Sequence, residues 1–332
     1  MILKLIKKDF IVLGCIALVF LIYSVFCLKV RSDDLAKSRK NDLETFRNEN
    51  ITYTEGDGLR MSTYVVGEGA HTVVLLGGIY DVSSTISLRP LANRLSEQNR
   101  VVVLDYFGCG FSDDTTEPRT AGRYVYEIRT ALSNLGIEGP CILMPSEISA
   151  LYALLYATEY PAEVEAIIAL DGAVSAQQED VVADLKLTPE SYQTRLKRQQ
   201  IGNEPLHAFY RYTGIDRTTW FMMERFFKYS QSENTLPLLE EHYHQHWYNH
   251  NHLDAYARVY DNHKQLAGVT YPETLPVLSI LGSQSCEGIY FPESDWQALH
   301  NSLITNPEIQ EIKVLPGNPY FAFYQHRLIA DE

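Results

Sequence analysis

Apolar residues form one long unbroken run near the start of the chain and only short runs after it. Residues 10–28 read FIVLGCIALVFLIYSVFCL and carry no charge. As a helix, these 19 residues span roughly 28 Å, which is enough to cross the hydrocarbon core of a bilayer. No small-residue cleavage site follows, although a cleaved or lipidated signal and a buried helix remain the alternatives. The pattern predicts a retained transmembrane anchor over residues 1–30.

Polar residues follow the anchor, and residues 31–49 are predicted to be a juxtamembrane linker or helix. From residue 50 on, short apolar runs alternate with helical patterns. Two runs, 51–54 and 60–66, flank the turn sequence EGDG and predict a hairpin. Further strands are expected at 72–76, 101–105, 141–144, 166–170, 276–281 and 311–315, with helices around 87–97, 122–135, 148–159 and 293–303. Such short β-branched runs between helices are typical of an α/β protein with a mostly parallel sheet and helices on both faces.

The segment from residue 172 to residue 270 shows no strand pattern. It is rich in Tyr, His, Gln and Glu at helical spacing. We expect a helical lid insertion here, between a first part of the core at 50–171 and a second part at 271–332. Such an insertion would cover the carboxyl ends of the strands, which is the edge where open α/β sheets bind ligands.

Charge divides the chain into a basic beginning and an acidic body. The formal net charge is −14, whereas residues 1–40 hold eight Lys/Arg and three Asp/Glu and so carry +5. The remaining −19 repels phosphate backbones, so nucleic acid is not expected as a partner. The basic end suits the anionic headgroups of a membrane lipid bilayer, which is the first expected partner.

The flanking charges bear on the orientation of the anchor. Three lysines precede the apolar run, and five basic residues follow it within residues 29–40. Counting positive charges slightly favours the domain on the cytoplasmic side. The layout of a short basic head, an apolar core and a long domain is instead that of a signal anchor. We therefore favour a single-pass membrane protein with its domain on the extracytoplasmic side.

Cysteines and histidines do not indicate a cofactor. The five cysteines form no CxxC pair, so neither a disulfide framework nor a zinc knuckle is suggested. His242, His246 and His250 recur every four residues, a spacing that can hold zinc, but the HExxH pattern is absent. We expect a polar, His-rich face of the lid and predict no cofactor and no metal.

Three stretches together carry a resemblance to a known superfamily. They are TVVLLGG (72–78), RVVVLDYFGCGFSDD (100–114) and CILMPSEISALYALLYATEY (141–160), each a strand that runs into a turn. This order resembles the α/β-hydrolase superfamily and is most similar to membrane-anchored α/β hydrolases of Gram-positive bacteria. The resemblance is good over residues 72–171 and weaker over the final strands. It implies an α/β-hydrolase fold, in which a Ser, an acid and a His form the catalytic triad.

The triad positions implied by this resemblance are all substituted. In the superfamily, a Tyr-Pro pair typically begins 13 residues after the nucleophile, and a strand-ending Asp lies 24 residues after it. Counting back from Tyr160 and from Asp171 gives Glu147 both times. The acid usually follows in a Gly-x-Asp pattern, which places Gln284 in its position. The His usually follows Pro-Gly-x-x, which places Tyr320 there.

Acyl transfer through a Ser-His-acid triad is lost with these substitutions. An oxyanion hole built from backbone N–H groups can survive, and its positions would be Gly78, Ile79 and Ile148. Glu147 itself has two interpretations. It is either a carboxylate nucleophile or base, or a relic whose carboxylate occupies its own oxyanion hole. The second is favoured, because Tyr320 cannot replace the missing imidazole near neutral pH.

Two further residues are weaker candidates. Asp171 is an alternative acid, although a helix cap or loop hydrogen bond is its plainer role. His326, six residues past the expected His, is a candidate substitute base. Three functions stay open: a non-catalytic membrane protein binding a small or lipid-like ligand or a partner, an active hydrolase rearranged around Glu147, and a structural interaction module that uses the lid.

Overall fold

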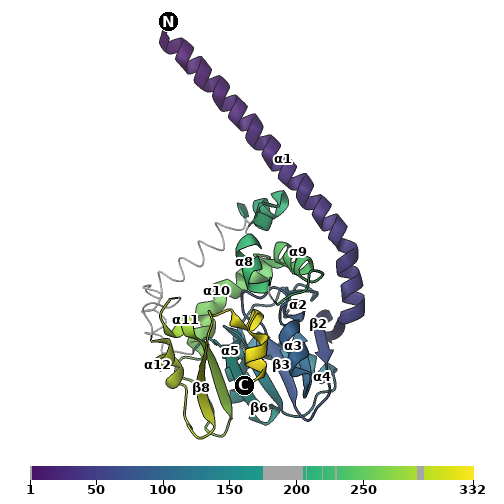
Figure 1. The fold of residues 1–332 in the computed structure, drawn as a ribbon, viewed down its shortest axis with the longest axis vertical. Helices are drawn as coiled ribbons and strands as arrows, with labels where there is room; N and C mark the ends of the chain where they lie inside the picture. The colour runs from purple at the N-terminus through teal and green to yellow at the C-terminus, as the bar shows by residue number, and fades with distance from the viewer. Residues whose placement is uncertain (1, 175–204, 207, 219, 229, 290–294) are drawn as a thin grey trace.

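The protein consists of an α/β body and one long helix that extends far beyond it. This computed structural model describes residues 2–174, 205–206, 208–218, 220–228, 230–289 and 295–332. Figure 1 shows α1 (Ile2–Asn50) leaving the body as a single rod toward the N-terminus. Part of the insertion, residues 175–204, lies outside the described residues.

The body is built on one eight-stranded sheet in the order β1-β2-β4-β3-β5-β6-β7-β8. The strands are β1 (Thr52–Gly56), β2 (Leu59–Val66), β3 (Thr72–Leu76), β4 (Arg100–Leu104), β5 (Cys141–Pro145), β6 (Val164–Leu170), β7 (Val277–Gly282) and β8 (Gln310–Leu315). β2 is antiparallel to both of its neighbours, and every other neighbouring pair is parallel. The predicted hairpin and the six further strands are confirmed.

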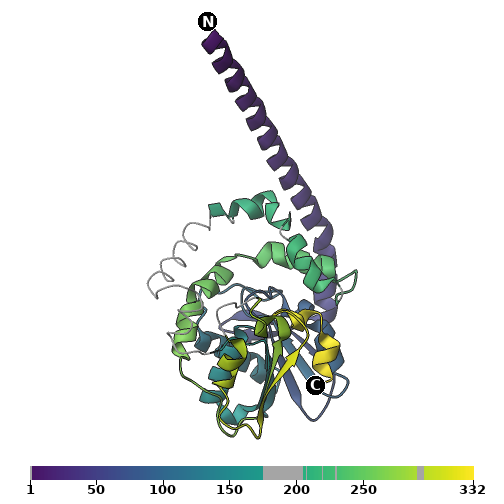
Figure 2. The same cartoon turned by 60° about the vertical axis from the view of Figure 1, so that its left-hand side comes forward.

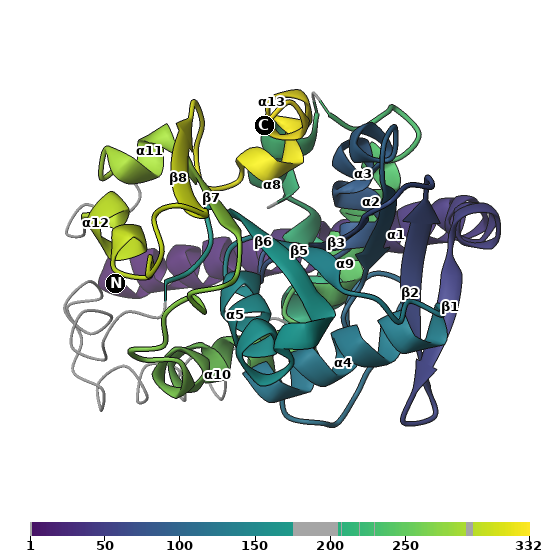
Figure 3. The ribbon, with the colours of Figure 1, turned by 90° about the horizontal axis from the view of Figure 1, so that it is seen from below.

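Both faces of the sheet are buried, as the continuous apolar strands predicted. Val74 and Leu76 of β3 belong to one core cluster, whereas Val73 and Leu75 belong to the other. Figure 3 shows the helices on either side of the sheet. They are α4 (Ala121–Asn134) and α5 (Ser149–Glu159) on one face, and α2 (Ser84–Ser87), α3 (Arg89–Leu95) and α13 (His326–Ala330) on the other.

The predicted helices are also present. The helix expected around 87–97 is α3, which has Pro90 in its first turn, and the short α2 precedes it. Three short helices complete the core: α11 (Ser283–Cys286) after β7, α12 (Trp296–Asn301) near the expected 293–303, and the 3-10 turn η3 (Phe321–Phe323) after β8. A further 3-10 turn, η1 (Pro161–Glu163), leads into β6.

The residues that the structure describes between 172 and 270 form helices joined by turns, with no strand among them. Residues 205–206 and 208–213 are helical, followed by η2 (Ile215–Thr218), α8 (Trp220–Phe227), α9 (Leu236–His246) and α10 (His250–Gln265). Figure 2 shows these helices arching over one end of the sheet. Tyr243 donates a hydrogen bond to the carbonyl of Tyr80, just after β3 (2.5 Å). The insertion is therefore seated on the carboxyl ends of the strands.

The segment expected as a linker or helix at 31–49 is the second half of α1. Its C-terminal turns pack on the body: Leu43 and Phe46 join the core cluster on the α3 side of the sheet, and Arg39 pairs with Glu240 of α9 at 2.9 Å. The first half carries exposed apolar side chains from Ile16 to Phe26. By length and composition, α1 is long and apolar enough to cross a membrane.

Candidate active site at the turn after β5

Glu147 occupies the tight turn between β5 and α5, as the two sequence landmarks predicted. β5 ends at Pro145 and α5 begins at Ser149, so only three residues make the turn. Glu147 has a φ of 49°, in the left-handed region that non-glycine residues rarely enter. A strained residue at this turn is typical of the nucleophile elbow of α/β hydrolases.

The carboxylate of Glu147 folds back onto the loop after β3. A Cβ atom added to Gly78 would lie 2.6 Å from the carboxyl carbon of Glu147, so the glycine leaves room for this side chain. Oε2 of Glu147 is buried and accepts no hydrogen bond from the described residues. Burial raises the pKa of Glu147 from 4.5 to about 8, the nearby Asp81 raises it further, and the N–H groups of Tyr80 and Ile79 partly offset the rise.

Asp81 is a second buried carboxyl group at this edge, and the sequence analysis missed it. Its Oδ1 accepts hydrogen bonds from the Ser87 hydroxyl (2.6 Å) and the Ser83 N–H (3.4 Å). Its Oδ2 has no hydrogen-bond partner among the described residues. Burial raises the pKa of Asp81 from 3.8 to about 7, and the Ser87 hydroxyl opposes that shift. The single signal in the sequence was an acidic residue four positions after the first glycine of the oxyanion loop.

The hydroxyl groups of the two serines beside Glu147 donate hydrogen bonds to backbone carbonyls. Ser146 donates to the carbonyl of Leu76 at 3.2 Å, and Ser149 donates to the carbonyl of Gly77 at 2.5 Å. Both side chains are buried. Neither hydroxyl meets an imidazole among the described residues, so neither has the base that would activate a serine nucleophile.

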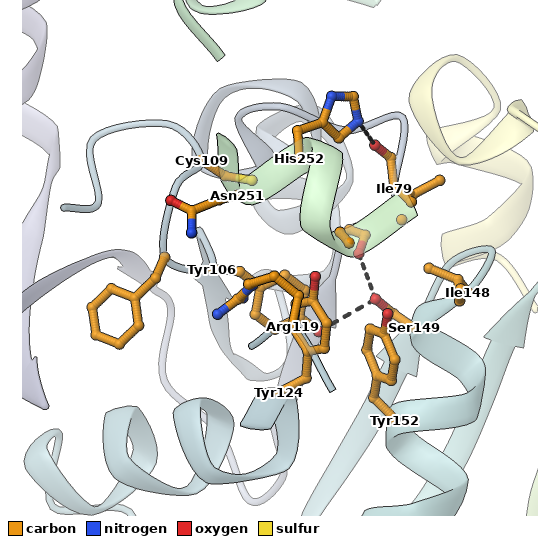
Figure 4. A pocket seen from close by; sticks show the side chains of 14 residues that line it. Ile79, Tyr106, Cys109, Arg119, Tyr124, Ile148, Ser149, Tyr152, Asn251 and His252 are labelled. Carbon is orange, nitrogen blue, oxygen red and sulfur yellow. Dashed lines mark hydrogen bonds between the residues drawn. The ribbon is translucent and has the colours of Figure 1, made fainter. Parts of the chain in front are cut away.

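The three positions proposed for the oxyanion hole surround one small cavity. Gly78, Ile79 and Ile148 line a space of about 30 Å³ together with Ser149 and His252. Figure 4 shows the aromatic and polar side chains that close it, from the β4 loop, α4, α5 and α10: Tyr106, Arg119, Tyr124, Tyr152 and Asn251. A cavity of this size holds about two water molecules.

His252 ties the insertion to the oxyanion loop. Its Nδ1 accepts a hydrogen bond from the N–H of Tyr248 at 2.9 Å. The ring proton is therefore on Nε2, which donates to the carbonyl of Ile79 at 2.9 Å. This tautomer leaves His252 no lone pair for Ser149, although both residues line the same cavity.

Tyr320 lies in an aromatic cluster that covers the carboxyl edge of the sheet. Its ring meets Tyr80 edge-on at 5.7 Å and Phe226 of α8 at 4.9 Å. Tyr80 also contacts Trp247 at 5.9 Å and Tyr256 at 6.2 Å. Side chains of the insertion therefore fill space at the edge where α/β sheets usually leave a ligand cleft.

Gln284 and Tyr320 lie at the same edge of the sheet as Glu147, since each follows the carboxyl end of a parallel strand. The N–H of Gln284 donates to the carbonyl of Gly317, which joins the two loops. The cavity at this edge, however, is lined by none of Glu147, Gln284 and Tyr320.

Asp171 fastens neighbouring elements together. Its Oδ2 accepts from the Ser285 hydroxyl (2.5 Å), and its Oδ1 accepts from the Trp296 indole (2.9 Å) and the Gly282 N–H (3.3 Å). These contacts join β6 to α11 and α12. No imidazole is among these partners, and His326 begins α13, which packs against α3.

The histidines of the insertion do not gather around a common point. His242 and His246 stack with ring centroids 5.4 Å apart, whereas His250 lies within hydrogen-bond distance of the carbonyl of Thr115. Among the described residues, no group of three or more His, Cys, Asp or Glu side chains is placed to hold a metal ion.

Comparisons with known proteins agree with this fold. No family model matches the sequence. A curated relative, the uncharacterized protein YbdG of Bacillus subtilis (strain 168), is 33% identical over 120 residues, which are 36% of this chain and 37% of that protein. The match therefore spans little more than a third of the relative's length.

Solved structures match a larger part of the chain at low identity. They include the epoxide hydrolase VrEH1 from Vigna radiata (17% identity, TM-score 0.63), a thermophilic esterase from Thermogutta terrifontis (16%, 0.58) and the haloalkane dehalogenase DatA from Agrobacterium tumefaciens C58 (16%, 0.59). Each match covers 85% of this chain and 96%, 96% and 94% of the respective structure. The chain has the α/β-hydrolase fold.

Proposed function

We propose that this protein is a membrane-anchored, non-catalytic member of the α/β-hydrolase fold class. The observation that carries the proposal is the carboxylate of Glu147 lying against Gly78, in the loop that would form the oxyanion hole. An oxyanion hole acts by stabilising negative charge that develops on the substrate. A carboxyl group that already occupies the loop excludes the substrate oxygen and, when ionised, repels the charge.

The same geometry bears on what the protein binds. The cavity of about 30 Å³ is too small for an organic ligand, and aromatic side chains form part of its wall. A small or lipid-like ligand would enter only after the aromatic cluster around Tyr80 and Tyr320 opens. The closed arrangement also suits a partner protein that binds the outer surface of the insertion.

The test is covalent labelling of the full-length protein in detergent with a fluorophosphonate, which reacts with activated serines. We expect no labelling, and no turnover of short-chain ester substrates. Ser146→Ala and Ser149→Ala serve as matched controls. Labelling of the wild-type protein that disappears in either variant would overturn the proposal.

An active hydrolase is the second candidate, and one observation favours it. The pKa values of Glu147 and Asp81 are raised to about 8 and about 7, which suits a general acid and a general base near neutral pH. Residual hydrolysis that falls in both Glu147→Gln and Asp81→Asn, with no serine labelling, would favour this candidate.

A further inference from the structure

The insertion exposes large apolar side chains close to the place where the apolar run of α1 ends. Leu206 and Phe209 are exposed, Tyr212 is 65% exposed and Phe221 is 79% exposed. The first three recur every three residues in helical segments, so they share one side of the chain. Apolar side chains gathered in this way on a surface mark a contact with a membrane or another molecule.

Direct contacts place this surface beside α1. The Lys29 ammonium lies over the ring of Tyr212, 4.7 Å from its centre. The Arg217 Nε donates to the Ser32 hydroxyl at 3.2 Å, and Gly214 packs so closely on Ser32 that a Cβ there would lie 2.7 Å from its Oγ. Figures 1 and 2 both show the 208–213 segment next to the middle of α1.

These contacts determine the depth of the insertion relative to the apolar run of α1. The uncharged run of α1 ends at Leu28, so Lys29 and Ser32 lie in the first turn beyond the hydrocarbon core. Tyrosine is enriched at this depth of a bilayer, and lysine there extends its charge toward the headgroups. The pairing of Lys29 with Tyr212 therefore puts the exposed apolar face of the insertion at the membrane–water interface.

We propose that the face formed by Leu206, Phe209, Tyr212 and Phe221 enters the interfacial region of the bilayer as a second membrane contact. The occupant of this face is lipid, because Tyr212 contacts Lys29, which lies three residues beyond Phe26 at the end of the exposed apolar side chains of α1 (Ile16 to Phe26). The inference rests on the proposed membrane anchor. It places the insertion, which covers the edge bearing Glu147, directly against the lipid from which an apolar ligand would come.

The experiment uses full-length protein in phosphatidylcholine vesicles whose acyl chains are brominated either near the glycerol end or at their middle, since bromine quenches tryptophan at contact. Four variants each add one tryptophan: Leu21→Trp in the anchor, Tyr212→Trp and Phe221→Trp in the proposed face, and Tyr126→Trp on α4. Tyr126 is 40% exposed on α4, which Figure 1 shows far from the 208–213 segment, and it is the matched control. The fluorescence of the native tryptophans is measured in the wild-type protein and subtracted from that of each variant.

We expect brominated lipid to lower the added fluorescence of Leu21→Trp, Tyr212→Trp and Phe221→Trp, and to leave that of Tyr126→Trp unchanged. Quenching of Leu21→Trp without quenching of the two insertion variants would overturn the second contact while the anchor stands. Absence of quenching at Leu21→Trp would refute the anchor and the second contact together. Quenching of Tyr126→Trp as well would show a body lying flat on the lipid, which also contradicts the proposal. If a second copy of the chain covered this face instead, Tyr212→Trp and Phe221→Trp would be protected from quenching. That protection would be lost at high lipid-to-protein ratios, where the copies separate.

Discussion

The side chain of Glu147 and the backbone of Gly78 share one small space between β5 and β3. An added Cβ at Gly78 would lie 2.6 Å from both the Cβ and the carboxyl carbon of Glu147. The two positions are therefore coupled: the acidic residue at the turn requires a residue without a side chain opposite it.

The first prediction tests this coupling. We expect Gly78→Ala to destabilise the protein by about 1–3 kcal/mol, the usual cost of forcing an extra carbon into a packed site. Glu147→Gly removes the opposing side chain and suits the φ of 49°, so the double variant should recover most of that loss. Chemical unfolding in detergent measures the free energies. Gly122→Ala on α4, where an added Cβ meets nothing within 4 Å, should cost nothing, and an equal loss there would refute the steric argument.

The second prediction concerns pH. Burial raises the pKa of Glu147 from 4.5 to about 8, so the folded state favours the protonated carboxyl group. Its stabilising contribution is complete below pH 4.5 and is lost as pH rises toward 8, at no more than about 1.4 kcal/mol per pH unit. Glu147→Gln should therefore raise the melting temperature at pH 8.5 and leave it unchanged at pH 4.5. Asp81→Asn should behave alike between pH 3.8 and about 7.

Exposed Glu159 on α5 supplies the control for this series. Glu159→Gln should leave the pH dependence of the melting temperature as in the wild-type protein. If Glu147→Gln also left it unchanged, the carboxyl group of Glu147 would have to be solvated and ionised in the fold.

The third prediction concerns recovery of catalysis. Glu147→Ser alone should not turn over esters or label with a fluorophosphonate, because Gln284 and Tyr320 still supply neither acid nor base. Adding Gln284→Asp and Tyr320→His should produce labelling, since both residues lie at the edge of the sheet that bears Glu147. Turnover by the single variant would reveal a base that the three positions do not include.

The fourth prediction concerns a buried ion pair that braces the β4 loop. Arg119 and Glu127 are 1% and 0% exposed, and they form a two-pronged contact at 2.5 and 2.9 Å. Arg119→Ala removes one of the two arginines that pair with the buried carboxylate of Glu127, since Arg123 remains at 3.1 Å, and should cost up to about 3–5 kcal/mol. Arg119→Met with Glu127→Leu should cost clearly less in the same unfolding experiment. Equal losses would show that the charges themselves, and not their pairing, are needed.

The fifth prediction concerns where the anchor can be cut. Deletion of residues 1–28 removes the apolar run and should give a soluble, folded body. Deletion of residues 1–40 should also be soluble but less stable by about 1–2 kcal/mol, because it removes Arg39 from Glu240 and Ser32 from Arg217. Thermal unfolding of the two proteins measures the difference. A truncated protein that only aggregates would place the boundary of the body earlier on α1.

The sequence predicted the sheet well because each strand is a short β-branched run bounded by turn residues. Val73 to Leu76 show the reason, since their alternate side chains enter two different cores and all must be apolar. The position of Glu147 was also predictable, because the length of α5 and of the following turn fixes its distance from Tyr160 and Asp171.

What the sequence did not predict depends on side-chain direction and on contacts between distant segments. The favoured interpretation of Glu147 put its carboxylate in the oxyanion-hole loop, but nothing local indicates that Asp81 lies near it. The aromatic residues of the insertion show helical spacing, but the sequence does not indicate which residues they contact. The contacts of Trp247 and Tyr256 with Tyr80 are visible only in the folded chain. The continuity of α1 through residue 50 was left open for a similar reason, since Leu43 and Phe46 need the body to define their buried side.

The uninterrupted course of α1 limits the positions that the body can take relative to the apolar run. A flexible tether would let the body search a hemisphere above its insertion point, whereas a helix that passes from the apolar run directly into contacts with α9 holds the body at one height. The 22 residues from Lys29 to Asn50 make a rod of roughly 33 Å. If α1 crosses a membrane as proposed, lateral diffusion carries the body through a thin layer parallel to the bilayer, where it meets only molecules that reach that layer. A rotation of the helix within the lipid would turn the whole body with it.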